Sequence, residues 1–198
     1  MARAGGTRYI FASPGLASCR RRPLSSNVMP QSQTPVSCIH LEIRRALPED
    51  APSCEHMLEL RRENAISPER VRHYGITEQS WAEDIRTDAF PGSVCHSKSK
   101  LLGYPFGARA SGEVVVLALL PQAESQGLGS RLLTLLVQEL LASGHTQLFL
   151  GYLPDTSSRS YGFYRHLGWQ STGTFDRAGD EILEHLSPAA LPAVPGGA

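Results

Sequence analysis

The most distinct pattern along the chain is an apolar run that changes directly into a helical pattern. Seven of the eight residues from Glu113 to Leu120 are apolar, which predicts a strand covered on both faces in the middle of a sheet. After Pro121, the residues Gly127 and Gly129 precede a segment in which leucines recur at helical spacing as far as Gly144. The pattern therefore predicts a buried strand, a tight glycine turn and an amphipathic helix.

The flanking segments predict the remaining elements of a mixed α/β fold. Alternating or short apolar runs predict strands at 39–45, from 94 onward, and at 101–106, 147–153, 172–175 and 181–186. Capping and spacing signals predict helices at 48–62, from 77 to the turn at Pro91, and at 157–167. The order strand, helix, strand from 113 to 153 predicts a right-handed crossover between two parallel strands.

Composition and charge narrow the classes of function. A length of 198 residues suits one globular domain with tails, and a net charge of zero gives no reason to expect a nucleic-acid or membrane-surface partner. No apolar run approaches the length of a membrane span. The four cysteines lie far apart without a C-x-x-C pair, so we expect neither a metal site nor a disulfide framework.

The first 41 residues differ from the rest of the chain, because they contain five arginines and no acidic residue before Glu42. A mitochondrial transit peptide has this composition, but Gly5-Gly6 and Pro14-Gly15 interrupt the amphipathic helix that it needs. The sequence from Leu16 to Cys19 is similar to a lipoprotein signal, but the apolar stretch before it is too short.

We favour a third interpretation, in which residues 1–38 are an extension that is disordered or wrongly assigned to the chain. The folded domain is then expected at 39–186, and the Pro/Ala/Gly-rich residues 187–198 are expected to be a disordered tail. A cytoplasmic location is the matching expectation, with a mitochondrial location as the alternative if the segment up to residue 28 is a transit peptide.

The glycine turn predicts an anion site, because backbone N–H groups in the first turn of a helix have no partner within the helix. Such groups bind phosphate well, and glycine lets the phosphate approach the backbone closely. A dinucleotide-binding turn is a weaker interpretation, because its third glycine is replaced by Leu132. The turn also lacks the Gly-Lys-Ser/Thr of a P-loop.

Together with a second motif, the turn resembles the GNAT superfamily of N-acetyltransferases. The matching residues are Pro121, the sequence Gln126-Gly127-Leu128-Gly129-Ser130, and the tyrosine-containing sequence from Gly162 to Trp169. The resemblance covers residues 41–186. It implies a twisted mixed sheet of six to seven strands, mostly antiparallel with a central parallel pair, flanked by about four helices.

The resemblance also implies acetyl-CoA as the co-substrate. Backbone amides of the glycine turn would hold its diphosphate, and the two parallel strands would part at their ends to pair with the pantetheine arm. A metal is not implied. The residues implied in binding acetyl-CoA are Leu119, Leu120, Gln126, Gly127, Leu128, Gly129, Ser130, Arg131, Ser157 and Tyr161.

The implied reaction is attack of a primary amine on a thioester. An aliphatic amine has a pKa of about 10.4, so forming the neutral amine at pH 7 costs roughly 4.6 kcal/mol. Glu113 matches a general base found in several branches of the family, and Tyr164 matches the acid that protonates the leaving thiolate. The alternatives are a solvated glutamate at a strand end and a core tyrosine. Tyr161 is the second choice for the acid.

Two departures from the family pattern bear on these roles. Glu124 places a negative charge where the family usually has Gln or Arg, and Ser157 replaces a frequent Asn. The first departure keeps open an alternative function, a non-catalytic acyl-CoA sensor or interaction domain of the same fold.

The acceptor is expected to be a primary amine of a small molecule or a protein, and a homodimer is left open. The loop 63–76, which contains Arg70, Arg72, His73 and Tyr74, is expected to line the acceptor side. Asp155 is a further candidate for attracting a cationic amine.

Overall fold

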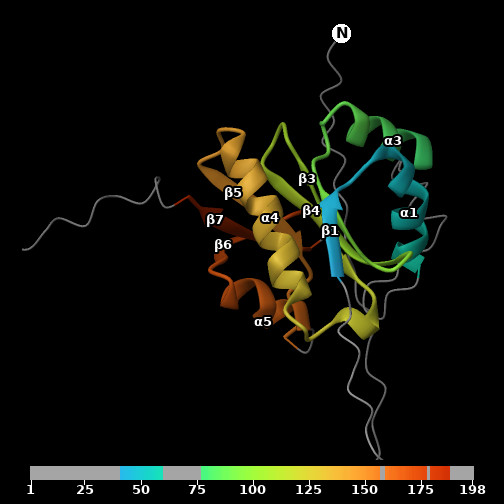
Figure 1. The fold of residues 1–198 in the computed structure, drawn as a ribbon. Helices are drawn as coiled ribbons and strands as arrows, with labels where there is room; N and C mark the ends of the chain where they lie inside the picture. The colour runs from blue at the N-terminus through green and yellow to red at the C-terminus, as the bar shows by residue number, and fades with distance from the viewer. Residues whose placement is uncertain (1–40, 60–76, 157–158, 178, 188–198) are drawn as a thin grey trace, which may run out of the picture.

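A seven-stranded sheet in the order β1-β2-β3-β4-β5-β7-β6 forms the centre of the structure (Figure 1). The structure is a computed structural model that describes residues 41–59, 77–156, 159–177 and 179–187. The strands are β1 Leu41–Arg45, β2 Ser93–Ser97, β3 Lys100–Ala108, β4 Glu113–Leu119, β5 Gln147–Tyr152, β6 Gln170–Phe175 and β7 Glu181–Leu186. The helices are η1 Pro48–Asp50, α1 Ala51–Glu59, α3 Glu78–Arg86, η2 Pro121–Ala123, α4 Leu128–Ala142 and α5 Arg159–His166.

The pairing of the strands confirms the expected mixed sheet. Strands β1 to β4 pair antiparallel, as do β5, β7 and β6, and the two groups are joined by the parallel pair β4–β5. The apolar strand β4 lies in the middle of the sheet with helices on both sides, as its lack of a polar face predicts. The order β5-β7-β6 places the last strand inside the sheet, which the sequence pattern did not predict.

A bulge interrupts the register of β4. Phe106 of β3 lies opposite Val116, but the next residue, Gly107, lies opposite Val114, so Val115 is the extra residue of β4. Such an insertion bends the strand and increases its local twist. The bulge therefore lies in the central strand, two residues after Glu113, where β4 is paired to β5.

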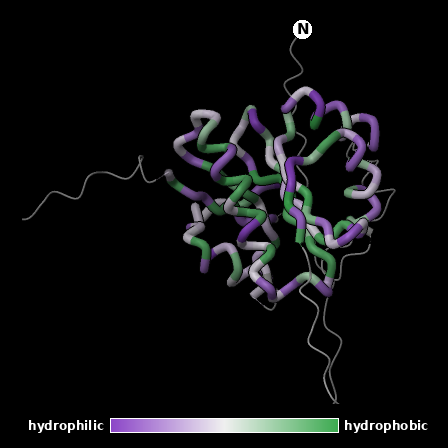
Figure 2. Tube along the Cα trace, viewed as in Figure 1, coloured by the Kyte–Doolittle hydropathy of each residue, from purple (hydrophilic) through white to green (hydrophobic). Residues whose placement is uncertain are grey.

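Two hydrophobic clusters form the core of the structure, and residues of α4 belong to both. Trp81 of α3 packs edge-on against Phe106 and Tyr104 of β3, with ring centroids 5.3 and 5.9 Å apart. On the other face, α4 places Leu133, Leu136 and Leu140 against β4 and β5, and α5 packs beside it. The hydropathy colouring shows the apolar stretches along the central strands and the hydrophilic ones at the outer turns (Figure 2).

Local signals in the sequence explain where the helices begin. Thr77 caps α3 by accepting from the Ser80 amide at 3.0 Å, while the Ser80 hydroxyl accepts from the Thr77 amide at 3.0 Å. Gly127 caps α4 in a left-handed conformation, at φ 75°. Helix α4 ends at Ala142, and Gly144 follows at φ 100°, as its predicted place after the helix requires.

Several expectations fall on residues outside the described part of the chain. These are the N-terminal extension 1–38, the loop 63–76, Ser157 and most of the tail 187–198. Among the described residues, no helix is long and apolar enough to cross a membrane. The same residues contain no group of His, Cys, Asp and Glu that could hold a metal ion.

Candidate functional site

The turn between β4 and α4 is built by two residues in the left-handed region. Ser125 has φ 59° and Gly127 has φ 75°, and between them the Gln126 side chain donates to the Gln122 carbonyl at 2.8 Å. A left-handed residue at the cap turns the chain abruptly into the helix, so the amides that follow point back past the start of the helix, where no carbonyl of the helix can accept from them. Gly127 is exposed, and nothing lies within 4 Å of the position that a Cβ would occupy.

The first turn of α4 carries the amides that the sequence predicted as an anion site. The Arg131 amide donates to the Gly127 carbonyl at 3.1 Å and so forms the first bond of the helix. The amides of Leu128, Gly129 and Ser130 precede this bond, and helix geometry gives them no acceptor within the helix. Because the Arg131 amide is bonded within the helix, only the exposed side chain of Arg131 is available to bind a phosphate.

Gly129 has a packing role that the sequence did not indicate. A Cβ at this position would lie 3.2 Å from Leu119 Cδ1 and 3.4 Å from the Phe163 ring. The absence of a side chain therefore lets the start of α4 lie directly against the end of β4 and against α5. This contact brings together the three elements that carry the predicted cofactor residues.

Strands β4 and β5 are paired at one end and part toward the other. Glu113 opposite Phe149 is the single partner position between them in the described residues, whereas β3 and β4 share six positions. The Leu120 amide donates to the Leu102 carbonyl of β3 at 2.9 Å. Because neighbouring residues direct their backbone groups to opposite sides, the groups of Leu119 face the β5 side, where the strands part.

The two predicted tyrosines lie on α5, on the same face of the sheet as α4. Tyr164 is half-buried and packs against Trp169 and Phe163, with ring centroids 6.3 and 5.2 Å away. Tyr161, one turn earlier, is also half-buried, and the Arg165 guanidinium lies 4.2 Å from the centre of its ring. Both tyrosines pack against the ring of Tyr152, the last residue of β5, at 6.2 Å.

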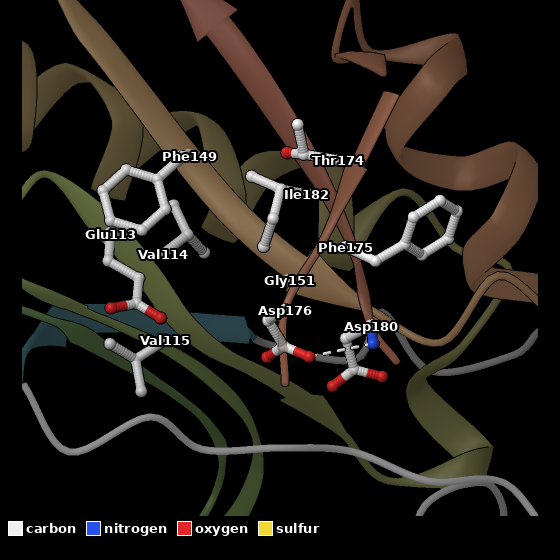
Figure 3. A pocket seen from close by; sticks show the side chains of 10 residues that line it. All are labelled: Glu113, Val114, Val115, Phe149, Gly151, Thr174, Phe175, Asp176, Asp180 and Ile182. Atoms are coloured by element: carbon white, nitrogen blue, oxygen red, sulfur yellow. Dashed lines mark hydrogen bonds between the residues drawn. The ribbon is translucent and has the colours of Figure 1, made fainter. Parts of the chain in front are cut away.

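A pocket of about 280 Å³ lies beside the paired ends of β4 and β5 (Figure 3). Three carboxylates line it, from Glu113 at the start of β4 and from Asp176 and Asp180 between β6 and β7. In the view of Figure 3 these carboxylates lie below the side chains of Phe149 and Ile182. Asp180 is 2% exposed, and its amide donates to the Asp176 carboxylate at 3.0 Å.

The pocket opens on the face of the sheet opposite α4. Its wall residues Phe149, Gly151 and Ile182 alternate with Leu148, Leu150 and Leu183, which pack in one cluster with Leu133, Leu136 and Leu140 of α4. Successive residues of a strand point to opposite faces, so the pocket belongs to the other face. Glu113 therefore lines one face of the sheet, while Tyr164 lies on the other.

The structure also separates the two ends of β4. Glu113 begins the strand and Leu119 ends it, so their Cα atoms are roughly 20 Å apart at the usual rise per residue. The glycine turn follows Leu119, whereas the pocket adjoins Glu113. The predicted phosphate-binding turn, here called the cradle, and the predicted base therefore lie at opposite ends of β4. Between these ends, β5 diverges from β4.

Some site residues were not found by reasoning from sequence. Asp176 and Asp180 lie between the strands predicted at 172–175 and 181–186, where no motif marked them, and their approach to Glu113 depends on the pairing of β7 with β5. Asp155 is half-buried, its amide donates to the Leu153 carbonyl at 2.8 Å, and it does not line the pocket.

Comparison with known proteins places this arrangement in context. A model of the acetyltransferase (GNAT) family matches residues 53–169. No curated protein matches the sequence closely enough to count as a relative.

The similar solved structures share the fold at low sequence identity. The PaiA N-acetyltransferase from Thermoplasma acidophilum, solved in complex with coenzyme A, is 18% identical with a TM-score of 0.63, covering 75% of this chain and 99% of that chain. YncA from Salmonella typhimurium, solved with its cofactor acetyl-CoA, is 18% identical with a TM-score of 0.60, covering 78% and 99%. The ribosomal-protein-S18-alanine N-acetyltransferase from Escherichia coli is 18% identical with a TM-score of 0.54, covering 73% and 91%.

Proposed function

Because the chain belongs to the acetyltransferase (GNAT) family, we propose that it transfers an acetyl group from acetyl-CoA directly to a primary amine. The observation that carries this proposal is the junction of β4 and α4. A left-handed glycine opens the helix beside a pair of parallel strands that are joined at one position only among the described residues. Two structures of similar fold contain coenzyme A or acetyl-CoA.

The residues at this junction fit the diphosphate and the arm of the coenzyme. The amides of Leu128, Gly129 and Ser130 supply donors at the positive end of the α4 dipole, where a diphosphate is stabilised. Each charge-assisted hydrogen bond contributes about 1.5–3 kcal/mol. The backbone of Leu119 faces the parting of the strands and would pair with the amides of the pantetheine arm.

The acceptor amine must lose a proton before or during attack. Glu113 lines the pocket, so an amine in that pocket lies within reach of its carboxylate, directly or through water. The amine nitrogen forms a bond to the thioester carbon, the carbon–sulfur bond breaks, and the electron pair leaves with sulfur. Tyr164 donates its hydroxyl proton to that thiolate, and the amine proton passes to Glu113.

The placement of these two groups on opposite faces of the sheet supports their opposite roles. A base must reach the incoming nitrogen and an acid must reach the departing sulfur, and both are bonded to the same carbon in the intermediate. If that carbon lies between β4 and β5, just beyond their paired position at Glu113 and Phe149, nitrogen approaches from the pocket face and sulfur lies toward α5. The parting of the strands is the feature that would connect the two faces.

The pocket is the proposed site for the acceptor. Carboxylates in a hollow surface focus a negative field, which attracts an ammonium group. Phe149 and Ile182 add an apolar wall for the carbon chain. A primary amine on a small molecule or at the end of a polypeptide fits this lining, and one of the similar structures is an acetyltransferase of a ribosomal protein.

A second candidate function is a domain that binds acyl-CoA without turnover. Glu124 favours this function, because it places a carboxyl group just before the glycine turn. The deciding experiment measures acetyl-CoA consumption with a panel of polyamines, amino acids, aminoglycosides and peptides with free N-termini, alongside calorimetry with acetyl-CoA and ATP. The transferase binds acetyl-CoA and consumes it with at least one amine. Binding without consumption over the whole panel would favour the sensor, and binding of ATP in place of acetyl-CoA would contradict both.

A further inference from the structure

A buried cluster of polar side chains ties together three elements around the tyrosines of α5. The Arg165 guanidinium donates to both oxygens of Glu181 of β7, at 3.0 and 2.9 Å. The Tyr152 hydroxyl at the end of β5 donates to Glu181 Oε2 at 2.7 Å, and accepts from Arg165. Glu181 is 7% exposed and Tyr152 is 4% exposed, so these two members of the cluster are shielded from water, while Arg165 is half-buried.

The cluster makes direct contact with Tyr164, the proposed proton donor, and with Tyr161, the second choice for the acid. The ring of Tyr152 packs against Tyr161 and against Tyr164, which follow each other by one helical turn. Arg165 covers the face of the Tyr161 ring and donates to the Tyr161 carbonyl at 3.2 Å. Movement of any one member of the cluster therefore moves the surface on which both rings rest.

The charges of the cluster are fixed over the ordinary pH range. Burial raises the pKa of Tyr152 to about 12, so its hydroxyl stays protonated. Hydrogen bonding to Tyr152 and then to Glu181 raises the pKa of Arg165 above its usual value. Burial opposes ionisation of Glu181, but hydrogen bonds from Ser171, Tyr152 and Arg165 outweigh it and lower the pKa of this carboxyl.

A fixed ion pair of this kind adds little net stability compared with apolar packing, because both charges must leave water. What it adds is direction, since one guanidinium nitrogen donates to both Glu181 oxygens while the other donates to Tyr152, which fixes the plane of the group. The described helix α5 is only eight residues long, too short to be stable alone. Its orientation therefore depends on side-chain contacts with the sheet.

We propose that Arg165, Glu181 and Tyr152 are positioning residues, which hold α5 so that Tyr164 is aimed at the parting of β4 and β5 and Tyr161 forms a wall beside it. The inference rests on the proposed function, because it takes Tyr164 as the proton donor. None of the three residues touches the reacting atoms. Their effect on rate passes through the placement of Tyr164, and a misplacement of about 1 Å in an active site costs on the order of 10²-fold.

The test compares variants of the cluster with a matched ion pair elsewhere. Arg109 of the β3–β4 turn has a side chain 30% exposed, against 29% for Arg165, and pairs with Asp88 at 2.8 Å and with Glu139 at 3.2 Å. Arg165→Gln, Glu181→Gln and their double variant are compared with Arg109→Gln in the full chain. The measurements are kcat, KM for the amine, the dissociation constant of acetyl-CoA, and the melting temperature.

We expect Arg165→Gln and Glu181→Gln to lower kcat about 10- to 100-fold with the amine KM changed less than about threefold. The double variant should lose no more than the worse single variant, because both changes break one device. Arg165→Lys, which keeps the charge but cannot donate to Glu181 and Tyr152 from two nitrogens, should recover part of kcat. Arg109→Gln should lower the melting temperature and leave kcat unchanged.

Tyr152→Phe keeps the protein testable if a charge variant does not fold, because it removes only the hydroxyl. Its kcat should also fall while its melting temperature stays near that of Arg109→Gln. If the cluster variants match Arg109→Gln in both kcat and melting temperature, the cluster is structural only and the inference is overturned. If the wild-type protein consumes no acetyl-CoA with any amine, the proposed function itself is overturned. The role of Tyr164 as proton donor is overturned with it.

Discussion

At the scale of single residues, the tyrosines of this protein differ in role because their surroundings differ. The hydroxyl of Tyr152 is held between Arg165 and Glu181, and the Tyr104 hydroxyl donates to the Cys54 carbonyl at 2.7 Å in the core. Tyr164 is half-buried near the end of β5, on the helix that follows the parted strands. The sequence identified Tyr164 by its motif, but the other two roles depend on partners distant along the chain.

Replacing Tyr164 by Phe tests the proton donor with the smallest possible change. We expect kcat to fall by ~10²–10⁴-fold, the usual contribution of general acid catalysis, with little change in the dissociation constant of acetyl-CoA. Tyr104→Phe is the matched control, because it removes a buried hydroxyl remote from α5 and should cost about 1 kcal/mol of stability without changing kcat. Equal kcat for Tyr164→Phe and the wild type would exclude Tyr164 as the acid.

A buried carboxylate makes the stability of the protein depend on pH. Asp50 accepts from Arg44 at 2.6 and 2.7 Å and from the Leu47 amide at 2.8 Å. Burial alone would raise the pKa of this carboxyl, but these hydrogen bonds outweigh it and lower the pKa. A group with a lowered folded-state pKa stabilises the fold above its unfolded pKa, and this stabilisation disappears as the pH falls through the folded value.

We therefore expect the free energy of unfolding to decrease as the pH falls below about 4, the ordinary pKa of an aspartate. Asp50→Asn should lose about 1.5–3 kcal/mol at pH 7, the value of hydrogen bonds to a charged group, and should show a flatter decrease in acid. Urea unfolding at several pH values measures both effects. Glu49→Gln, an exposed neighbour in the same turn, is the control, and an equal change in that variant would contradict the assignment to Asp50.

At the scale of elements, helix α4 shows how one kind of residue serves two purposes. Gly127 precedes the helix and Gly144 follows it, both with positive φ and with nothing within 4 Å of a Cβ at either position. Both glycines satisfy the same backbone requirement. Only Gly127 lies beside the amides that are proposed to hold the diphosphate.

Alanine at each of these glycines separates backbone strain from binding. Each substitution should cost roughly 1–2 kcal/mol of stability, because alanine disfavours the left-handed region. Gly127→Ala should also weaken the binding of coenzyme A about tenfold or more, because an added Cβ at the cap would hold the phosphate away from the amides that follow and weaken a charge-assisted hydrogen bond. Calorimetric binding and thermal unfolding measure the two effects. If Gly144→Ala weakened the binding of coenzyme A as much as Gly127→Ala, the cradle at the start of α4 would be ruled out.

At the scale of the whole molecule, the sheet divides the proposed chemistry between its two faces. The carboxylate-lined pocket lies on one face, and the helices α4 and α5, with the predicted cradle and acid, lie on the other. Neither half of the proposed site exists within one element. The pairing of β7 between β5 and β6 brings Asp176 and Asp180 to the same pocket as Glu113.

The acidic lining predicts a preference among acceptors. Asp176→Asn keeps an oxygen that can accept from the Asp180 amide but removes a charge. We expect KM to rise about 2- to 5-fold for an acceptor with two cationic groups, as the loss of one partly screened charge predicts. The KM of a neutral-tailed amine should change less.

The control is Glu42→Gln, which removes an exposed charge from the edge strand β1. Steady-state kinetics with matched diamines and monoamines measure the difference. If the ratio of KM for the diamine to KM for the monoamine is unchanged in Asp176→Asn, this carboxylate does not contribute to recognition of the acceptor.

Much of the fold could be predicted because its signals are local. The apolar run of β4, the caps Thr77 and Gly127, and the leucine spacing of α4 each depend on a few adjacent residues. The predicted elements agree with the observed ones to within a few residues wherever the structure describes them. The bulge at Val115 and the place of β7 were missed, because they depend on which strand lies beside which.

The sequence by itself determined the family, the elements and the candidate cradle, since motif residues and periodicity are fixed by neighbours along the chain. Only the tertiary structure decided at which residues β4 and β5 are paired, that three carboxylates share one pocket, and that Arg165 contacts Glu181 next to the tyrosines of α5. Such contacts join residues that folding brings together from far apart, and their energies depend on burial and orientation, which no local pattern contains.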